Sequence, residues 1–176
     1  MHTPAYLRGV IDGTLDPATW RRVGFPWSSL AVERSRRSCG GTLAALTTAC
    51  AGDGIAVNLA GGTHHAFADR GGGYCIFNDS MVAARHAQAH GHARRILVVD
   101  LDVHQGDGTA ALCAGDSTVF AFSMHGQGNY PARKQAGDLD VALPDGCDDA
   151  RYLAEPARSL PEALARARPD AVIYLA

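Results

Sequence analysis

The sequence has no C-x-x-C pair, no apolar run of transmembrane length and no strong excess of one charge. Its five cysteines are odd in number and widely spaced, which argues against a disulfide scaffold or a zinc ribbon and favours a reducing compartment. A formal net charge of −2 gives no support for non-specific nucleic-acid binding. The first residues lack the basic and apolar regions of a signal peptide. We therefore expect a cytoplasmic protein that binds neither membranes nor nucleic acid directly.

What the chain does contain is enough apolar material for one folded domain. It has 176 residues, of which 47% are hydrophobic and 19% charged, as in an ordinary globular protein. The short Arg-rich stretch at 34–37 is interpreted as a solvated face. No internal repeat or low-complexity linker marks a boundary, so residues 1–176 are predicted to form a single domain.

Hydrophobic periodicity predicts strands and helices that alternate along most of the chain. Residues 1–23 are predicted to be irregular, with one short helix near 17–22, and irregular structure continues to residue 40. Helices are expected at 42–50, 79–90, 107–113 and 149–167, strands at 55–59, 96–99, 118–122 and 171–175, and a glycine-rich loop at 66–78. This alternation predicts an α/β fold with a mainly parallel sheet. In such sheets, functional residues gather beyond the carboxyl ends of the strands.

Two carboxylates and an imidazole follow the apolar run at 96–99. Asp102 and His104 are two positions apart, so in an extended segment their side chains point the same way. A carboxylate oxygen and an imidazole nitrogen suit Zn²⁺, with Fe²⁺ or Mn²⁺ as alternatives. Asp100 lies deeper and needs a partner, either a neighbouring imidazole or a second cation. The competing interpretation is that an Asp at a strand end only caps the next helix.

A histidine doublet, His64 and His65, stands in a glycine-rich turn. Two adjacent imidazoles at a strand end fit a general base and its electrostatic partner. Each needs an acceptor that fixes its tautomer, and Asp100 and Asp107 are the candidates. Asp107 is equally well explained as a helix N-cap.

Other candidates are weaker. The loop containing Gly73 and Tyr74 is either simply flexible or approaches a ligand closely, with the Tyr74 ring lining a channel. Ser123 can offer oxygen to a hard cation. Tyr130 either walls a pocket or packs in the core.

Three motifs together resemble the zinc-dependent histone deacetylase family. They are Gly61-Gly-Thr-His-His-Ala66, Gly73-Tyr-Cys-Ile-Phe-Asn-Asp79 and Asp100-Leu-Asp-Val-His-Gln-Gly-Asp-Gly108. Flanking segments near 24–28, 58–62 and 138–141 look most like its class IV-type and related bacterial branch. The resemblance runs from about Gly24 to Ala176. It implies a three-layer αβα arrangement of the arginase/deacetylase type.

The resemblance also implies a role for each matching residue. Asp102 and His104 match two of three zinc ligands. His65 matches the general base and His64 its electrostatic partner or acid, while Asp100 and Asp107 match their carboxylate partners. A structural potassium site is matched by the Asp100 side chain, backbone oxygens of Asp102 and His104, Ser123 and the Met124 carbonyl. Gly73, Tyr74 and Tyr130 match the acyl-lysine channel.

The family pattern continues beyond the last residue given. In the family the third zinc ligand is an Asp in a Gly-Ala-Asp segment directly after the strand that corresponds to 171–175, and a transition-state tyrosine follows later. The resemblance therefore implies an incomplete deacetylase domain, C-terminally truncated, with weak zinc affinity and little activity alone.

The substrate implied by the resemblance is an acetylated or acylated lysine in a protein, or a small acylated amine such as an acetylpolyamine. One alternative is a non-catalytic remnant that binds acyl-lysine. Another is a ureohydrolase-like enzyme with two metals, which would need a carboxylate at position 106, where this chain has Gly106.

Overall fold

A computed structural model describes residues 1–176. The chain forms two compact units, residues 1–92 and 93–176, and each is considered by itself. The expectation of a single domain stays a prediction. None of the helices combines the length and apolar character needed to cross a membrane.

The first unit begins with two short helices, α1 (Pro4–Asp12) and α2 (Pro17–Arg21). The prediction that residues 1–23 are irregular apart from a helix near 17–22 is therefore wrong for α1. Thr3 caps α1 by accepting from the Tyr6 amide, with a proline directly after it. Asp16 and Pro17 start α2 in the same way. These prolines occupy the first helical position, where no amide hydrogen is needed, so they begin helices instead of breaking them.

The long helix α3 (Ser29–Ala51) packs against α4 (Asp79–Ala89). Helix α3 starts well before the predicted residue 42, because the Ser28 hydroxyl accepts from the Ala31 amide and caps it. Its arginines lie on an exposed face, where Arg37 pairs with Glu33 at 2.8 Å. Helix α4 begins at the predicted residue 79 and ends one residue before the predicted residue 90.

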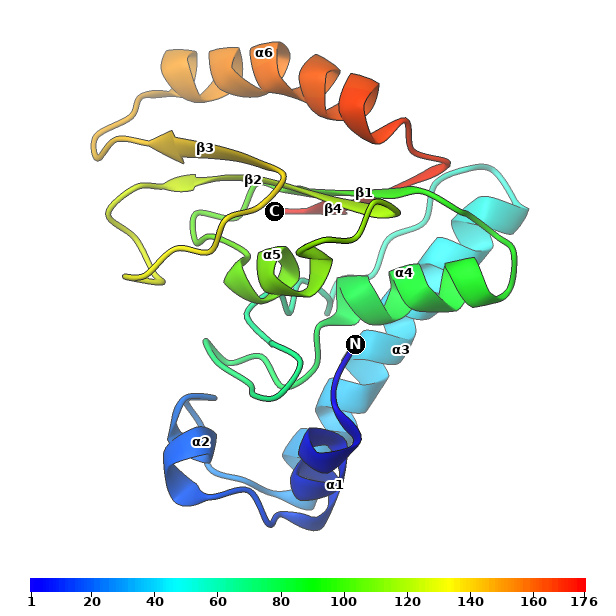
Figure 1. The fold of residues 1–176 in the computed structure, drawn as a ribbon, viewed down its shortest axis with the longest axis vertical. Coiled ribbons are helices and arrows are strands. Elements are labelled where there is room, and N and C mark those ends of the chain that lie inside the picture. The colour runs from blue at the N-terminus through cyan, green and yellow to red at the C-terminus, as the bar shows by residue number, and fades with distance from the viewer. The chain divides into compact units, whose positions relative to one another are not determined.

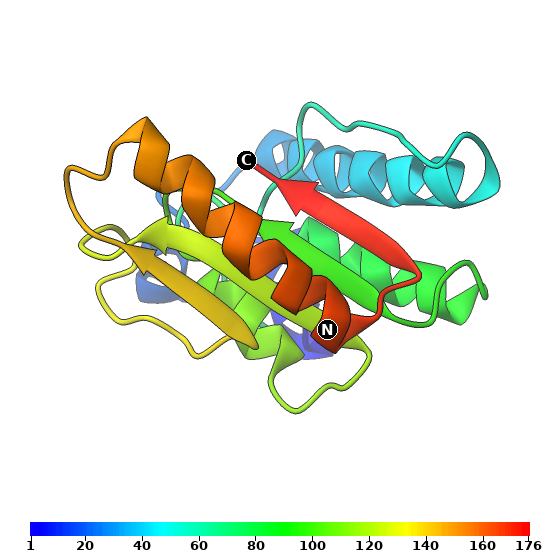
Figure 2. The same cartoon turned by 90° about the horizontal axis from the view of Figure 1, so that it is seen from above.

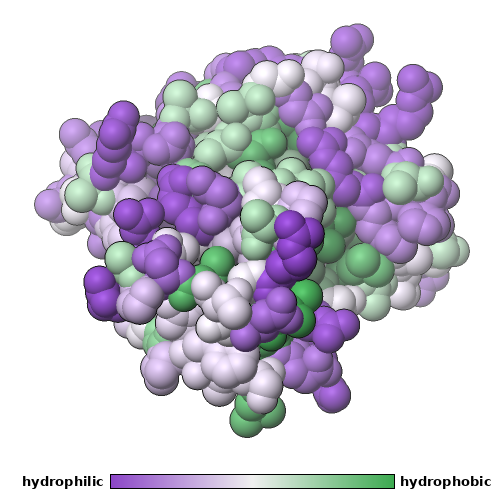
Figure 3. Space-filling view, turned by 60° about the horizontal axis from the view of Figure 1, so that its bottom comes forward, coloured by the Kyte–Doolittle hydropathy of each residue, from purple (hydrophilic) through white to green (hydrophobic).

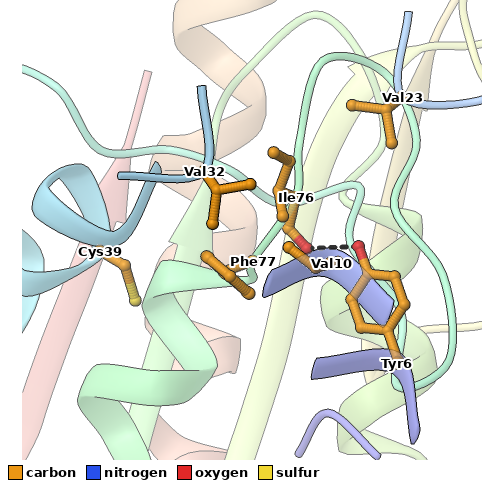
Figure 4. Packing of buried hydrophobic residues seen from close by; sticks show 7 residues of the cluster. All are labelled: Tyr6, Val10, Val23, Val32, Cys39, Ile76 and Phe77. Carbon is orange, nitrogen blue, oxygen red and sulfur yellow. Dashed lines mark hydrogen bonds between the residues drawn. The ribbon is translucent and has the colours of Figure 1, made fainter. Parts of the chain in front are cut away.

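The core of this unit joins the N-terminal helices to the glycine-rich loop. Figure 4 shows the Tyr6 hydroxyl donating to the Ile76 carbonyl at 2.8 Å, among buried side chains from α1, α3 and the loop. Its buried members are Tyr6, Val10, Val23, Val32, Cys39, Ile76 and Phe77. The burial of aliphatic side chains around this hydrogen bond fixes the loop on the helices.

Residues 55–59 do not form the predicted buried strand. The segment pairs with no strand of the sheet, and Ile55, Val57 and Leu59 are 84%, 74% and 98% exposed. An apolar run makes a strand only where a neighbouring strand accepts its backbone hydrogen bonds. Figure 3 shows one face on which hydrophobic residues reach the surface among hydrophilic ones.

The second unit is a four-stranded sheet in the order β3-β2-β1-β4, with every neighbouring pair parallel. Its strands are β1 (Ile96–Asp100), β2 (Val119–Gly126), β3 (Leu139–Leu143) and β4 (Ala171–Leu175). Strand β1 is buried along its whole length, as a central parallel strand must be.

Helices cover both faces of this sheet. Helix α6 (Asp149–Ala167) runs obliquely over one face and contacts β1, β2 and β3, while α5 (Asp107–Cys113) contacts β2 from the opposite side (Figures 1 and 2). Ala163 of α6 packs in one buried cluster with Leu97, Phe122 and Met124 of the sheet. The arrangement confirms an α/β fold with three layers and a parallel sheet.

Two strands differ from the prediction. Strand β2 extends to Gly126, so Ser123 and His125 lie within it and do not follow it. No strand is predicted at 139–143, because Asp140 interrupts the apolar residues there. In the structure this segment is β3, whose side chains are mostly half-buried or exposed. Parallel pairing with β2, in which Ser123 is aligned with Asp140, creates this strand and continues β2 past its first polar residue.

Candidate active site

In the first unit, the histidine doublet is held by the carboxylate of Asp79. One carboxylate oxygen accepts from the Thr63 amide and hydroxyl, both at 2.8 Å, and the other accepts from the Gly62 amide at 3.0 Å. The Thr42 hydroxyl on α3 donates to this second oxygen at 2.5 Å. Asp79 is completely buried, so these donors stabilise its charge. The segment just before the histidines is thereby fixed to α3 and α4.

Asn78 supports the other side of the same turn. Its side-chain oxygen accepts from the Met81 amide and caps α4, while its amide donates to the His64 and Ala66 carbonyls at 3.4 and 3.3 Å. The sequence predicts a helix cap at 78 or 79 but not this second role. The sequence Phe77-Asn78-Asp79 at the start of a helix is the only local signal that could have indicated that Asn78 also binds the histidine turn.

The two imidazoles themselves are buried and adjacent. His64 and His65 are each 4% exposed, and their ring centroids lie 4.1 Å apart. Gly73 approaches one of these rings so closely that a Cβ atom there would lie 2.4 Å from Cδ2 of His65. The structure therefore brings the predicted doublet together with one predicted channel residue.

Tyr74 has an unusual backbone conformation. Its φ of 65° lies in the left-handed region, which non-glycine residues seldom adopt. The side chain is 69% exposed and its ring stacks on that of Phe25, with centroids 6.5 Å apart. Such strain is often found at ligand-binding positions, which agrees with the predicted channel role.

In the second unit, the polar cluster begins at the carboxyl end of β1. Asp100 is the last residue of the strand, is 2% exposed, and accepts from the Asp102 amide at 3.1 Å. Residues 101–104 bend and are not extended. The side chains of Asp102 and His104 nevertheless meet, because one carboxylate oxygen of Asp102 accepts from the His104 amide at 2.7 Å and lies 2.8 Å from its ring Nδ1.

This pair fits part of a zinc site. A carboxylate oxygen and an imidazole nitrogen, the donor types that zinc prefers, lie 2.8 Å apart, and both side chains are partly exposed, so an ion can reach them. Catalytic zinc normally has three protein ligands at about 2.0–2.2 Å, with water in the fourth position. No group of three or more His, Cys, Asp or Glu side chains is arranged to hold a metal ion. The prediction that Asp102 and His104 are two of three zinc ligands stays a prediction.

Asp107 does not cap helix α5. The cap position is Gly106, and Asp107 is the buried first residue of the helix, with its carboxylate accepting from the Gly108 amide at 3.0 Å. The N-cap interpretation is therefore wrong, since a cap must precede the first helical residue. Its predicted role as a partner of a catalytic histidine stays a prediction.

The residues predicted for a potassium site lie side by side. Asp100 on β1 is aligned with Ser123 on β2, and Met124 follows it in the same strand. The Ser123 hydroxyl lies 3.0 Å from Nδ1 of His125, which is 2% exposed. Burial lowers the pKa of His125, against the opposing influence of the Asp140 carboxylate. Burial thus favours the neutral form of the His125 imidazole.

Tyr130 lies at the surface near the candidate zinc ligands. Its side chain is 47% exposed, and its ring stands edge-on to that of His104, with centroids 6.3 Å apart. This agrees with a wall of a binding site better than with core packing.

The predicted site residues thus form two clusters, one in each compact unit. His64, His65, Gly73 and Tyr74 belong to the first, and Asp100, Asp102, His104, Asp107, Ser123, Met124 and Tyr130 to the second. The prediction that the histidine doublet acts as a general base and its electrostatic partner stays a prediction.

Comparison with known proteins gives this arrangement a family. The histone deacetylase domain model matches residues 1–176. An uncharacterized protein of Picosynechococcus sp. is 50% identical over 175 residues, which cover 99% of this chain and 58% of that protein. The chain belongs to the histone deacetylase family.

Solved structures show the same fold. The crystal structure of the HDA15 HD domain superposes with a TM-score of 0.75 at 22% identity, covering 99% of this chain and 55% of that one. An acetylpolyamine aminohydrolase from Burkholderia pseudomallei gives a TM-score of 0.66 at 28% identity, covering 78% of this chain and 43% of that one. The chain spans about half the length of these relatives.

Proposed function

We propose that this chain is part of a zinc-dependent amide hydrolase that removes acetyl or longer acyl groups from lysine side chains or small amines. The observation that carries the proposal is that a carboxylate oxygen of Asp102 lies 2.8 Å from Nδ1 of His104, just after the carboxyl end of β1. The histone deacetylase domain matches this chain throughout, which supports the same conclusion. We further propose a cytoplasmic location and a potassium ion beside Asp100 and Ser123.

The proposed chemistry divides between the two clusters. Zinc, when bound, supplies a Lewis acid that polarises the acyl carbonyl. Asp102 and His104 would hold it. An imidazole nitrogen of His65 takes the proton of the attacking water, and His64 stabilises the charge or returns a proton to the leaving amine. Burial of both rings limits their contact with bulk water, which strengthens these electrostatic interactions. Tyr74 and Tyr130 bind the apolar part of the acyl-lysine.

Zinc binding tests the first half of the proposal. Isothermal titration with Zn²⁺ should show a site in the wild-type chain that is lost in His104→Asn and Asp102→Asn. Asp149→Asn, on the exposed first turn of α6, is the control and should bind like wild type. His86, His90 and His92 lie with ring centroids 4.0–6.4 Å apart, so adventitious binding there is subtracted with His104→Asn. Equal zinc binding by wild type and His104→Asn contradicts the proposed ligands.

Hydrolysis tests the second half. Because we expect weak zinc affinity and little activity of this chain alone, it is assayed at high protein concentration with excess zinc. The substrates are an acetyl-lysine peptide, a long-chain acyl-lysine peptide and an acetylpolyamine. We expect release of the acyl group to fall by at least about 100-fold in His65→Ala. The likeness to an acetylpolyamine aminohydrolase favours the small amine as the second candidate substrate. Binding of acetyl-lysine peptide without zinc and without hydrolysis would instead favour a non-catalytic acyl-lysine-binding protein.

A further inference from the structure

Gln105 is a buried polar residue that the proposed chemistry does not use. It follows His104 directly and is only 1% exposed. Its side-chain amide nitrogen donates to the Gln135 carbonyl at 2.7 Å and to a carboxylate oxygen of Asp140 at 2.9 Å. Its side-chain oxygen accepts from the Gln135 amide at 2.8 Å. Every polar atom of this side chain is therefore used, and the backbone donor at Gln135 fixes which end is oxygen.

These bonds anchor the connection between β2 and β3. Residues 127–138 form this connection, which carries Tyr130. The backbone amide of Gln105 donates to the Tyr130 carbonyl at 3.2 Å, and the backbone amide of Gly126 donates to the Val103 carbonyl at 2.9 Å. The segment after β1 is thus joined to the connection at its start, near Tyr130 and at Gln135. Asp140 completes the anchor, because its second carboxylate oxygen accepts from the Gly137 amide at 2.7 Å.

We propose that Gln105 is a positioning residue that sets the place of the Tyr130 ring relative to His104 and so determines which acyl groups the site accepts. This inference rests on the proposed function for its consequence, but its structural half stands on the hydrogen bonds alone. The side-chain and backbone bonds of Gln105 join the segment that carries His104 to the segment that carries Tyr130. The ring centroids of His104 and Tyr130 lie 6.3 Å apart. Removing the side-chain bonds leaves the backbone bond from Gln105 to the Tyr130 carbonyl but takes away the contacts of Gln105 with Gln135 and Asp140.

The structural half is tested without activity by replacing the five tyrosines with 3-fluorotyrosine and recording ¹⁹F NMR spectra. The Tyr130 signal is assigned with Tyr130→Phe. In Gln105→Met, which keeps the volume and deletes the side-chain hydrogen bonds, only the Tyr130 signal should shift and narrow. Gln127→Met, in the same connection but exposed, is the matched control and should leave all signals unchanged. An unchanged Tyr130 signal in Gln105→Met overturns the proposal, as does an equal change of all five.

Asp140→Asn provides a second route if Gln105→Met does not fold. Asp140 is exposed, so this change opens no cavity. An asparagine has one side-chain oxygen for the two donors that Asp140 serves, so the same Tyr130 shift should appear at smaller size. No shift in this variant contradicts the proposal.

The functional half is read as a ratio. In Gln105→Met the ratio of kcat/KM for a long-chain acyl-lysine peptide to that for an acetyl-lysine peptide should rise about three- to tenfold, through KM more than kcat. A purely structural role would lower both values in proportion and leave the ratio unchanged. If the NMR change occurs but no variant hydrolyses any substrate, the proposed function fails and the positioning role remains.

Discussion

Gly73 controls the space available to the candidate general base. Its φ of 49° suits glycine, and a Cβ would meet the His65 ring at 2.4 Å, a distance at which something must shift. Because the ring is buried, it has little room to move away without disturbing His64 as well. The absence of a side chain at this position is thus part of the geometry of the doublet.

We therefore predict that Gly73→Ala displaces the His65 ring. The matched control is Gly54→Ala, which has a φ of 84° and nothing within 4 Å of the added Cβ, so it reports backbone strain alone. Each variant should lose about 1 kcal/mol or more of stability from strain. Only Gly73→Ala should change the imidazole chemical shifts of His65 in ¹⁵N NMR and lower any hydrolysis by tenfold or more. Unchanged His65 shifts in Gly73→Ala would show that the close approach of Gly73 does not constrain the ring.

Other site residues were accessible to sequence reasoning only in part. Asp102 and His104 are recognisable because metal ligands have characteristic side chains and spacing. Asp79 and Gln105 are not, since a carboxylate that binds loop amides and an amide that binds a distant backbone carry no local pattern. Their roles depend on segments far away in the chain, such as Thr42 and Gln135.

At the scale of elements, the N-terminal residues anchor the glycine-rich loop through His2. Its Nδ1 lies 2.8 Å from the Phe67 carbonyl, and its Nε2 accepts from the Asn78 amide at 2.9 Å. A carbonyl can only accept and an amide can only donate, so the ring must be neutral with hydrogen on Nδ1. Protonation would place a second hydrogen against the Asn78 amide.

Stability should consequently fall in acid through this contact. Burial has the largest effect and lowers the pKa of His2. The hydrogen bond to the Phe67 carbonyl raises this pKa in part, and repulsion by the N-terminal charge lowers it further. The unfolded chain then binds a proton below about pH 6.5 while the folded chain resists it, so stability decreases as pH falls from there toward the folded pKa. The slope is at most about 1.4 kcal/mol per pH unit for one proton. Urea unfolding from pH 7.5 to 5 should show a shallower decline in His2→Gln, and identical slopes for the two proteins would contradict this.

Helix α6 contains two prolines, and one of them offers a simple gain in stability. Pro161 is exposed in the interior of the helix, where it provides no amide hydrogen for the Ala157 carbonyl. Pro161→Ala should raise the free energy of unfolding by about 1–3 kcal/mol, reduced by the greater freedom of the unfolded chain. Pro17→Ala, at the first position of α2, is the comparison and should give no gain. The measurement is urea unfolding followed by circular dichroism, and no gain in Pro161→Ala would count against the argument.

Elements whose partners lie close in sequence or whose pattern is fully apolar could be predicted, and elements made by tertiary pairing could not. The bounds of α4, α5, α6, β1 and β4 follow from caps and apolar runs. Strand β3 and the end of β2 exist because they pair with each other. The apolar segment at 55–59 shows the reverse case, since its pattern is typical of a strand but it has no partner.

At the scale of the whole molecule, the fold places the zinc candidates at the carboxyl ends of parallel strands. Asp102 and His104 follow β1, the most buried strand, and Ser123 lies opposite its last residue. Rigid strands with a bending segment at their ends can present polar groups without burying them unpaired. Any ion held there would connect the end of β1 to the start of α5.

Zinc should therefore stabilise the folded protein by an amount that depends on its concentration. A ligand that binds only the folded state adds about 2.7 kcal/mol at 100 times its Kd. The gain should appear in the ¹⁹F signals of Tyr130, Tyr152 and Tyr174, which lie in residues 93–176, during urea unfolding with and without Zn²⁺. Asp102→Asn should lose the gain, whereas Asp149→Asn should keep it. An equal gain in Asp102→Asn would show that the ion binds elsewhere and would contradict the proposed ligands.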